Sequence, residues 1–330
     1  MLESLRTVRG AVSTERLVPV LSHFAFRDGR VCGFNGRVFI SAPAPEITLN
    51  VTVPARPLLT AYDAMATDGD TSDVRLTLLE DGRLRISKKR QRVTLPAGPV
   101  EAFPFADPTR AKRQRVPKGL LALFERLRPF VGDDASRPWS ASVKLQGAVA
   151  YATNNIVLVQ APTPDKCPLL AAVLPVQAVD ELLRIGAEPT HVTVERDACT
   201  FYLPGDAWLR TVLLHDTWPD AAGVLKAAHA GTKLVAYPTG QWGQAVEAVR
   251  PFCPDPKHEV VVMEGSEIRT LEGDISASVE GFKFPAAYSF HVAPLLATLH
   301  AASHLSLVPY PRVPWRNTDG MLGVTLGLAT

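Results

Sequence analysis

Two histidines near the C-terminal end, His300 and His304, have the spacing at which one face of a helix can hold a metal ion. Metal-assisted processing of a nucleic acid would be the chemistry of such a pair. No H-E-x-x-H pattern accompanies them and no third ligand stands out, so a role on a helix surface or at a helix end is favoured. Asp216 and Asp220 flank a Trp-Pro dipeptide and could imitate a catalytic carboxylate pair, but turn formation explains them better.

Other catalytic patterns are absent from the sequence as well. It holds no G-x-S-x-G, Walker or G-x-G-x-x-G signature. The four cysteines are far apart and form no C-x-x-C pair, so they predict inert thiols in a reducing compartment rather than a zinc site or a disulfide framework. These cysteines are Cys32, Cys167, Cys199 and Cys253. We therefore predict a protein with no enzymatic activity, no cofactor and no metal.

The composition of the chain limits the class of protein that carries these side chains. With 330 residues, of which 46% are hydrophobic, the chain can build two or three domains that each bury a core. A formal net charge of +2 neither requires nor excludes a polyanion partner, so the distribution of charge matters more than its sum. Charged residues interrupt the N-terminal stretch, and no run approaches the ~20 apolar residues of a membrane helix. A soluble, cytoplasmic protein is expected.

An internal repeat predicts how the chain is organised. Residues 53–65, 174–186 and 290–302 each begin with an extended apolar stretch and continue with apolar residues at helical spacing. A strand-like alternation follows each of them, at residues 73–78, 191–195 and 304–308. Helical candidates also begin near Leu2, Pro117 and Thr239, ahead of alternating segments with hairpin turn signals.

A spacing of more than a hundred residues between copies is too long for a solenoid repeat. The pattern instead predicts an α+β fold of three repeated domains, each with two helices packed on β-sheet. The expected domains are residues 1–110, 111–230 and 231–330. Three such copies can form an arc, and two arcs joined head to tail can close a ring.

Four segments resemble the bacterial DNA polymerase III β sliding clamp family, and the resemblance covers nearly the whole chain. Residues 8–23 resemble its first helix and the start of its first strand, and residues 53–59 resemble the start of its second helix. Residues 83–104 are similar to the strand pair that closes its first domain, with the final acidic-x-Phe-Pro. Residues 213–225 resemble its aromatic-Pro-Asp segment.

The resemblance implies a head-to-tail homodimer that encircles double-stranded DNA without reading its sequence. It also implies a DNA polymerase and a clamp loader as partners, with no chemistry of the protein's own. A pI near 8.3 and a C-terminus that lacks the family's usual ending suggest a divergent, phage-type member. The alternative is a clamp-fold protein that does not close a ring and binds DNA or a replication protein as a regulator or inhibitor.

The family binds apolar partner peptides in a cleft, and the resemblance carries that role to particular positions here. Residues 154–157 depart from the family's pattern and lose its His-Arg pair, which questions whether the same peptides bind. Packing in an ordinary strand core is the alternative role for the cleft residues. The expected cleft residues are Thr153, Asn155, Leu158, Pro219, Val224, Val324 and Leu326.

Cations are the candidates for contact with DNA phosphates, because a sliding ring should avoid base edges. The segment 109–128 is strongly basic, and a helix there would present Lys118 and Arg126 away from its apolar stripe. Solvated surface charge is the alternative role for each cation. The candidates are Arg6, Arg9, Arg16, Arg113, Arg115, Lys118, Arg126, Arg184 and Arg250. For the ring interface the resemblance indicates Phe103, with Phe252 as its apolar counterpart; core packing is the alternative for both.

Overall fold

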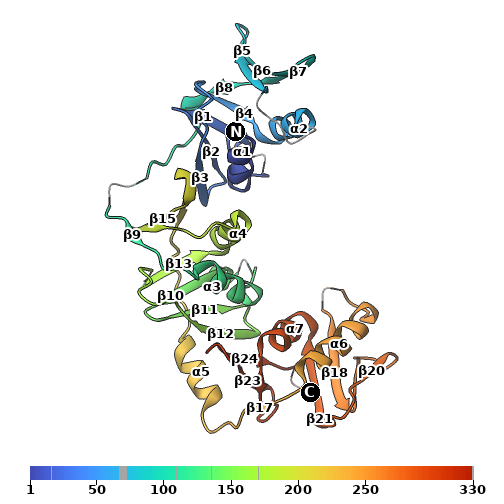
Figure 1. Cartoon of the computed structure of the whole chain (residues 1–330). Coiled ribbons are helices and arrows are strands. Elements are labelled where there is room, and N and C mark those ends of the chain that lie inside the picture. The colour runs from blue at the N-terminus through green and yellow to red at the C-terminus, as the bar shows by residue number, and fades with distance from the viewer. Residues whose placement is uncertain are drawn as a thin grey trace. The chain divides into compact units, whose positions relative to one another are not determined.

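The computed structural model describes residues 1–15, 17–66, 73–108, 111–134, 136–169, 171–256 and 258–328. The chain divides into two compact units (Figure 1). Unit 1 comprises Met1–Leu121 and Gln177–Leu213, and unit 2 comprises Ala122–Val176 and Leu214–Thr330.

The predicted repeat of helix, strands, helix and strands is confirmed. The first copy consists of α1 (Leu2–Val8), β1 (His23–Arg27), β2 (Arg30–Phe34), β3 (Val38–Pro43), β4 (Val51–Pro54), α2 (Ala55–Met65), β5 (Arg75–Leu78), β6 (Arg83–Lys88), β7 (Gln91–Pro96) and β8 (Gly98–Pro99). The second consists of β9 (Gln114–Arg115), α3 (Leu120–Leu127), β10 (Ser142–Gln146), β11 (Val149–Thr153), β12 (Val157–Pro162), β13 (Ala171–Pro175), α4 (Val176–Ile185), β14 (His191–Val194), β15 (Ala198–Tyr202), β16 (Trp208–Val212) and α5 (Ala221–His229). The third consists of β17 (Val235–Ala236), α6 (Thr239–Val249), β18 (Val260–Gly265), β19 (Glu267–Thr270), β20 (Ser276–Ser278), β21 (Phe284–His291), α7 (Val292–Ala301), β22 (His304–Leu305), β23 (Arg312–Arg316) and β24 (Leu322–Leu326).

The strand-to-helix step recurs in all three copies. β4 runs directly into α2, β13 into α4 and β21 into α7. The first helix of each copy ends in a short 3₁₀ turn that starts with arginine, at Arg9–Ala11, Arg128–Phe130 and Arg250–Phe252. The repeat therefore extends to single turns of the chain, which is finer detail than the sequence pattern predicted.

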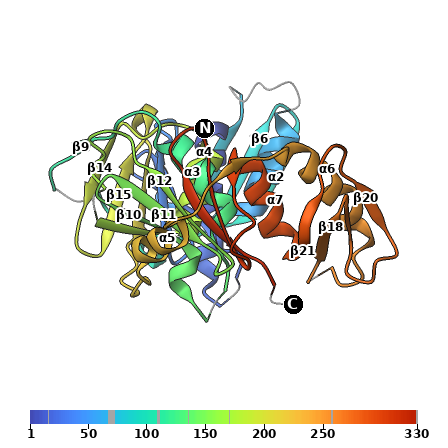
Figure 2. The same cartoon turned by 90° about the horizontal axis from the view of Figure 1, so that it is seen from below.

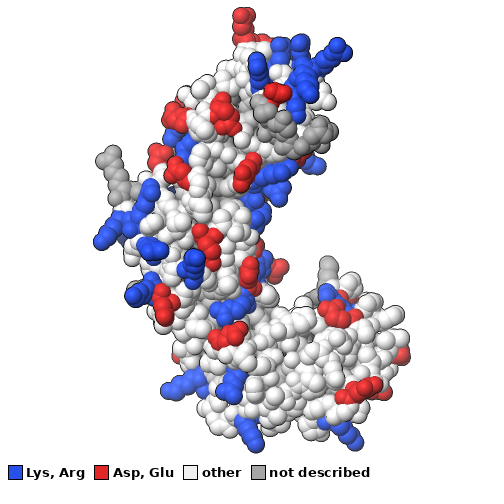
Figure 3. Space-filling model, viewed as in Figure 1, with Lys and Arg blue, Asp and Glu red and all other residues white. Residues whose placement is uncertain are grey.

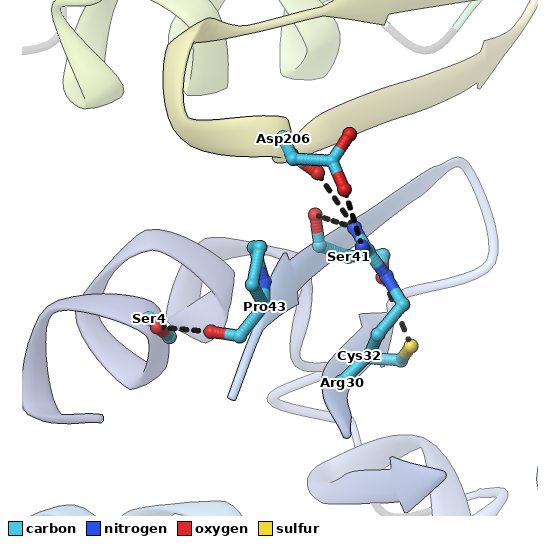
Figure 4. A network of polar contacts seen from close by, with 6 residues as sticks. All are labelled: Ser4, Arg30, Cys32, Ser41, Pro43 and Asp206. Carbon is cyan, nitrogen blue, oxygen red and sulfur yellow. Dashed lines mark hydrogen bonds and ion pairs between the residues drawn. The ribbon is translucent and has the colours of Figure 1, made fainter. Parts of the chain in front are cut away.

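Unit 1 is built on one nine-stranded sheet in the order β8-β4-β1-β2-β3-β16-β15-β14-β9. Within it, β3 of the first copy pairs with β16 of the second, with Ile40 opposite Leu209. The guanidinium of Arg30 reinforces this connection (Figure 4), because its Nε donates to Ser41 Oγ at 2.8 Å and one of its NH groups donates to the Asp206 carbonyl oxygen at 2.8 Å. We call such a pairing of strands from successive copies a joint.

Unit 2 holds a second joint of the same kind. Its eight-stranded sheet has the order β13-β10-β11-β12-β24-β23-β22-β17, so β12 of the second copy pairs with β24 of the third. The four-stranded sheet β20-β19-β18-β21 carries both α6 and α7 on one face (Figures 1 and 2). Trp242 of α6 and Leu295 of α7 line one small cavity there with Met263 and Phe290. Two helices thus cover one face of the sheet, as the repeat predicted.

The three-stranded sheet β5-β6-β7 of unit 1 is also covered on one face, in this case by the single helix α2. Leu84 and Ile86 of β6 are fully buried, and α2 contacts β6 and β7. The predicted domain boundaries near residues 110 and 230 stay predictions, because the division into units follows the two continuous sheets rather than the repeats. Within the residues that the structure describes, no helix combines the length and the apolar character needed to span a membrane.

Candidate functional site

The β11–β12 hairpin of unit 2 forms one end of an apolar cleft. Its turn holds Asn155 at a φ of +71°, a left-handed conformation that asparagine tolerates better than most residues. The neighbouring Asn154 fixes the turn, since its Oδ1 accepts hydrogen bonds from the backbone N–H groups of Ile156 at 3.1 Å and Val157 at 2.8 Å. The turn therefore leads the chain into β12 with Leu158 half-buried.

The pairing of β12 with β24 decides which side chains of the C-terminal strand face the cleft. Leu158 lies opposite Val324, so these two side chains share a face of the sheet. Thr325 points to the other face, where its Oγ1 lies 2.6 Å from Thr298 Oγ1 of α7 and accepts from Trp315 Nε1 at 3.1 Å. Leu326 returns to the cleft face and is 41% exposed.

Helix α5 forms the opposite wall. Asp220 caps it, because its Oδ1 accepts from the backbone N–H of Gly223 at 3.0 Å. Leu225 and Ala228 pack onto the sheet, whereas Val224 is 49% exposed beside the cavity. The buried Trp218, just before the helix, donates from Nε1 to Ser142 Oγ at 3.3 Å, which fixes the start of α5 against β10.

Between these walls lies a cavity of about 730 Å³. The structure brings all seven residues of the predicted cleft to its lining, although they come from three separate stretches of the chain. A cavity of this size with mainly apolar walls can hold two or three large apolar side chains. What occupies it stays a prediction.

Sequence reasoning missed other residues of the lining. Trp139 lies in the 3₁₀ turn before β10 and stacks edge-on against Trp218, with ring centroids 5.8 Å apart. Arg137 and Arg312 bring two cations to the lining, and Ile156 joins it from within the stretch that departs from the family's pattern. The Asn-Asn turn was the one signal in the sequence that could have placed Ile156.

Three of the predicted DNA-contacting arginines lie together in unit 1. Arg184 of α4 donates to the backbone carbonyl oxygens of Arg6 at 2.9 Å and Thr7 at 2.6 Å, and it pairs with Glu181. Its guanidinium therefore links α4 to α1, and its nitrogens already donate hydrogen bonds within the chain. Arg6 is exposed but pairs with Asp63 at 2.9 Å, whereas Arg9 is exposed at the end of α1.

The basic segment before α3 differs from its prediction. The helix begins at Leu120 rather than near Pro117, because Gly119 adopts a φ of +97° and breaks helical geometry. Lys118 is exposed but lies in the preceding turn, so its predicted helical position is wrong. Arg115 is exposed in β9, at the edge of the sheet, and the guanidinium of Arg113 lies 3.9 Å from the centre of the Tyr202 ring.

Two further candidates lie in unit 2, and one cannot be placed. Arg126 of α3 is half-buried beside His300 in a second cavity of about 530 Å³, and its Nε has no hydrogen-bond partner among the described residues. Arg250 pairs with Glu259 at 2.9 Å. Arg16 lies outside the described residues. The structure thus does not gather the nine cations into one patch within either unit.

The two phenylalanines predicted for a ring interface differ in exposure. Phe103 has 3% of its surface exposed and packs with Phe39 and Phe105, at ring distances of 6.2 and 5.1 Å. Its ring fills the core of unit 1 and leaves almost nothing for a second chain to contact, so core packing is the role the structure gives it. Phe252 is 57% exposed at the end of the 3₁₀ turn that follows α6.

The candidate catalytic groups do not come together. Helix α7 ends at Ala301, so His300 lies on the helix whereas His304 starts strand β22. The described residues contain no cluster of three metal-ligating side chains. Burial raises the pKa of Cys32 to about 11 despite a hydrogen bond to Ser41, which keeps this thiol protonated and unreactive at neutral pH.

Comparison with known structures gives the fold a name. The chain superposes on the DNA polymerase sliding clamp from Bacillus subtilis with a TM-score of 0.79 at 17% sequence identity, covering 100% of this chain and 97% of that one. The sliding clamp from Caulobacter crescentus gives 0.79 at 20% identity, and a DnaN sliding clamp from Bartonella birtlesii gives 0.81 at 16%, with the same coverage. No protein-family model matches the chain, and no curated protein matches it. The chain therefore has the fold of the bacterial β sliding clamp over its full length.

Proposed function

We propose that this protein is a DNA sliding clamp. Two chains close head to tail around duplex DNA and hold a DNA polymerase on its template, without chemistry of their own. A clamp of this kind works in the cytoplasm and depends on a loader to open the ring. A phage origin stays a prediction from the sequence.

The observation that carries this proposal is the pattern of paired and unpaired strand edges. At both joints, the third strand after the first helix of one copy pairs with the third strand after the second helix of the next copy: β3 with β16, and β12 with β24. The strands left in these two positions are β20 of the third copy and β7 of the first. Each lies at the edge of its sheet with no partner on that side among the described residues.

Open edges of this kind invite pairing with another chain. If β20 of one chain pairs with β7 of a second, the third joint repeats the rule of the first two. Two chains then form two identical joints, and the ring closes with no strand edge left open at a joint. Phe252 would lie at this joint as an exposed apolar contact, since the helix before it, α6, packs on β19 and β20.

The cleft of unit 2 supports the second half of the proposal. Its exposed apolar walls, with Val224 on α5 and Leu326 on β24, suit a short peptide that inserts Leu and Phe side chains. Such a peptide at the end of a polymerase would tether that enzyme to the ring. Because residues 154–157 depart from the family's pattern, we expect a peptide preference that differs from that of other clamps.

The decisive experiment combines solution mass with retention on DNA. Light scattering across a concentration range should give twice 35.7 kDa. A chain loaded onto nicked circular DNA should stay bound at a salt concentration that removes it from a linear duplex of the same length. Equal loss from both substrates would contradict an encircling ring.

The same measurement addresses the competing function, a clamp-fold protein that stays open as a regulator or inhibitor. The backbone N–H of Val279 bonds to β19, so by alternation the N–H of Ser278 points to the open edge. Substituting Ser278 by proline in β20 removes that N–H and should lower the dimer fraction. Proline at Ser266, outside this edge, is the matched control. A wild-type chain that stays a monomer at all concentrations, with or without DNA, would favour the open form.

A further inference from the structure

The three-stranded sheet β5-β6-β7 of unit 1 has one strongly basic face. The pairing registers place Arg75, Ser87 and Arg92 side by side, and Thr77, Arg85 and Thr94 in the next row. Arg83 starts the row after that. The opposite face carries Leu84 and Ile86, which are fully buried under α2.

The first two rows of this face carry cations and hydroxyl groups only. Its arginines stand about 7 Å apart along β6 and about 10 Å apart from β5 to β7, from the usual rise and spacing of strands. Arg83 pairs with Asp81 at 2.6 Å, whereas Arg75, Arg85 and Arg92 form no ion pair with any residue that the structure describes. Figure 3 shows Lys and Arg side chains gathered where Figure 1 places these strands.

From this arrangement, we propose that the basic face of β5-β6-β7 binds the phosphate backbone of duplex DNA, as a contact separate from the one that encircles it. Guanidinium groups and hydroxyls are donors that phosphate oxygens accept, and such contacts carry no sequence information. The face has no aromatic side chain on which unstacked bases could rest, which favours duplex over single-stranded DNA. Because α2 covers the other side of this sheet, the bound segment lies on the side away from the helices.

The proposal does not require the ring to close, so it can fail or succeed independently of the sliding function. The probe is a short linear duplex of about two helical turns, from which a closed ring slides off freely. Its affinity is measured by fluorescence anisotropy across a salt series, with the full chain. The test variant is the double substitution Arg85→Gln and Arg92→Gln.

The matched control is Arg37→Gln with Arg196→Gln, which removes the same charge from exposed positions elsewhere in unit 1. The test variant should reduce the magnitude of the salt slope by about 1.8 and weaken binding at low salt roughly tenfold, since each phosphate contact contributes about 0.9 to the slope. The control should leave the slope unchanged.

Two outcomes would overturn the proposal. A slope that falls equally in the test and control variants would show only a nonspecific effect of net charge. An unchanged slope with a reduced dimer mass would assign the face to contact with the acidic β18–β21 sheet of a second chain, where Glu264 and Glu267 lie. Retention on circular DNA is scored separately, so failure here leaves the clamp proposal standing.

Discussion

The two joints of this protein have the same strand arrangement, but different side chains pack beside the paired strands. At the joint in unit 1, Phe39 of β3 stacks on Trp208 of β16 with ring centroids 5.1 Å apart and an interplanar angle of 8°. Phe103 packs into the same cluster from the segment that follows β8. At the joint in unit 2, Leu158 takes the place of Phe39 and lies opposite Val324, and helix α5 leaves a large apolar cavity beside them.

The spaces that remain at the two joints differ in chemistry as well as in size. The cavity in unit 1 is about 330 Å³ and is lined by Arg27, Arg30, Asp107 and Asp206, which pair with one another across it. The cavity in unit 2 is about twice that volume, and its walls are mostly apolar. A joint filled by the chain's own aromatic rings is complete, whereas a joint left apolar and open is suited to a side chain from another molecule. Substitutions at each joint test this contrast.

The largest effect should come from emptying the filled joint. Phe103→Ala removes a buried ring from the aromatic cluster and should destabilise unit 1 by about 3–5 kcal/mol. Phe252→Ala removes a ring that is 57% exposed and should change the free energy of unfolding of the isolated chain by no more than about 0.5 kcal/mol. Urea denaturation of dilute monomer measures both. Comparable losses in the two variants would contradict the assignment of Phe103 to the core.

At the open joint, substitution should change binding rather than folding. Val224→Asp replaces an apolar wall of the cleft with a charge and should weaken binding of a short peptide with adjacent Leu and Phe side chains roughly 10- to 100-fold. Calorimetric titration measures the affinity. Val235→Asp, at an exposed valine in β17 outside the cleft, is the control. Unchanged affinity in the Val224 variant would move the peptide site elsewhere.

A smaller effect should follow from loosening helix α5, one wall of the open joint, without changing the apolar side chains of its lining. Asp220→Ala removes the side-chain cap of α5 and should cost about 1 kcal/mol of local stability. Amide hydrogen exchange should then accelerate in α5 before it does in β12 or β24. Asp216→Ala, in the same exposed segment before the helix, is the control, and equal exchange in both variants would argue against a structural role for the cap.

The sequence predicted the open joint better than the filled one, for a physical reason. The resemblance to the clamp family assigned Leu158, Val324 and Leu326 to the cleft, and it could do so because it rests on short local stretches of the chain. The burial of Phe103 depends on Phe39 and Trp208, which lie far away in the chain, and no local pattern reports such contacts. Lys118 was misplaced because a glycine at one position overrode the helical periodicity around it.

Charge predictions were the weakest, since a sequence shows cations but not their partners. Arg184 looked like a surface cation, yet it is held by Glu181 and by backbone carbonyl oxygens of α1. The hairpin cations of β6 and β7 were given no role, because only the strand register reveals that Arg75, Arg85 and Arg92 share one face. The repeat itself was predictable, because it rests on apolar spacing within each copy.

The smallest expected effect is a dependence of the stability of unit 1 on pH. His23, the first residue of β1 in unit 1, has a buried Nδ1 without a hydrogen-bond partner among the described residues, and burial lowers the pKa of its imidazole. As the pH falls below about 6.5, the unfolded chain takes up a proton that the folded chain does not, so the stability of unit 1 decreases from there down to the lowered pKa. Urea denaturation at pH 7.5 and 5.5, followed in unit 1, should show this loss in the wild type and a smaller one in His23→Gln. His191→Gln, at an exposed histidine of the same unit, should behave like the wild type; an identical pH response in all three proteins would exclude His23 as the source.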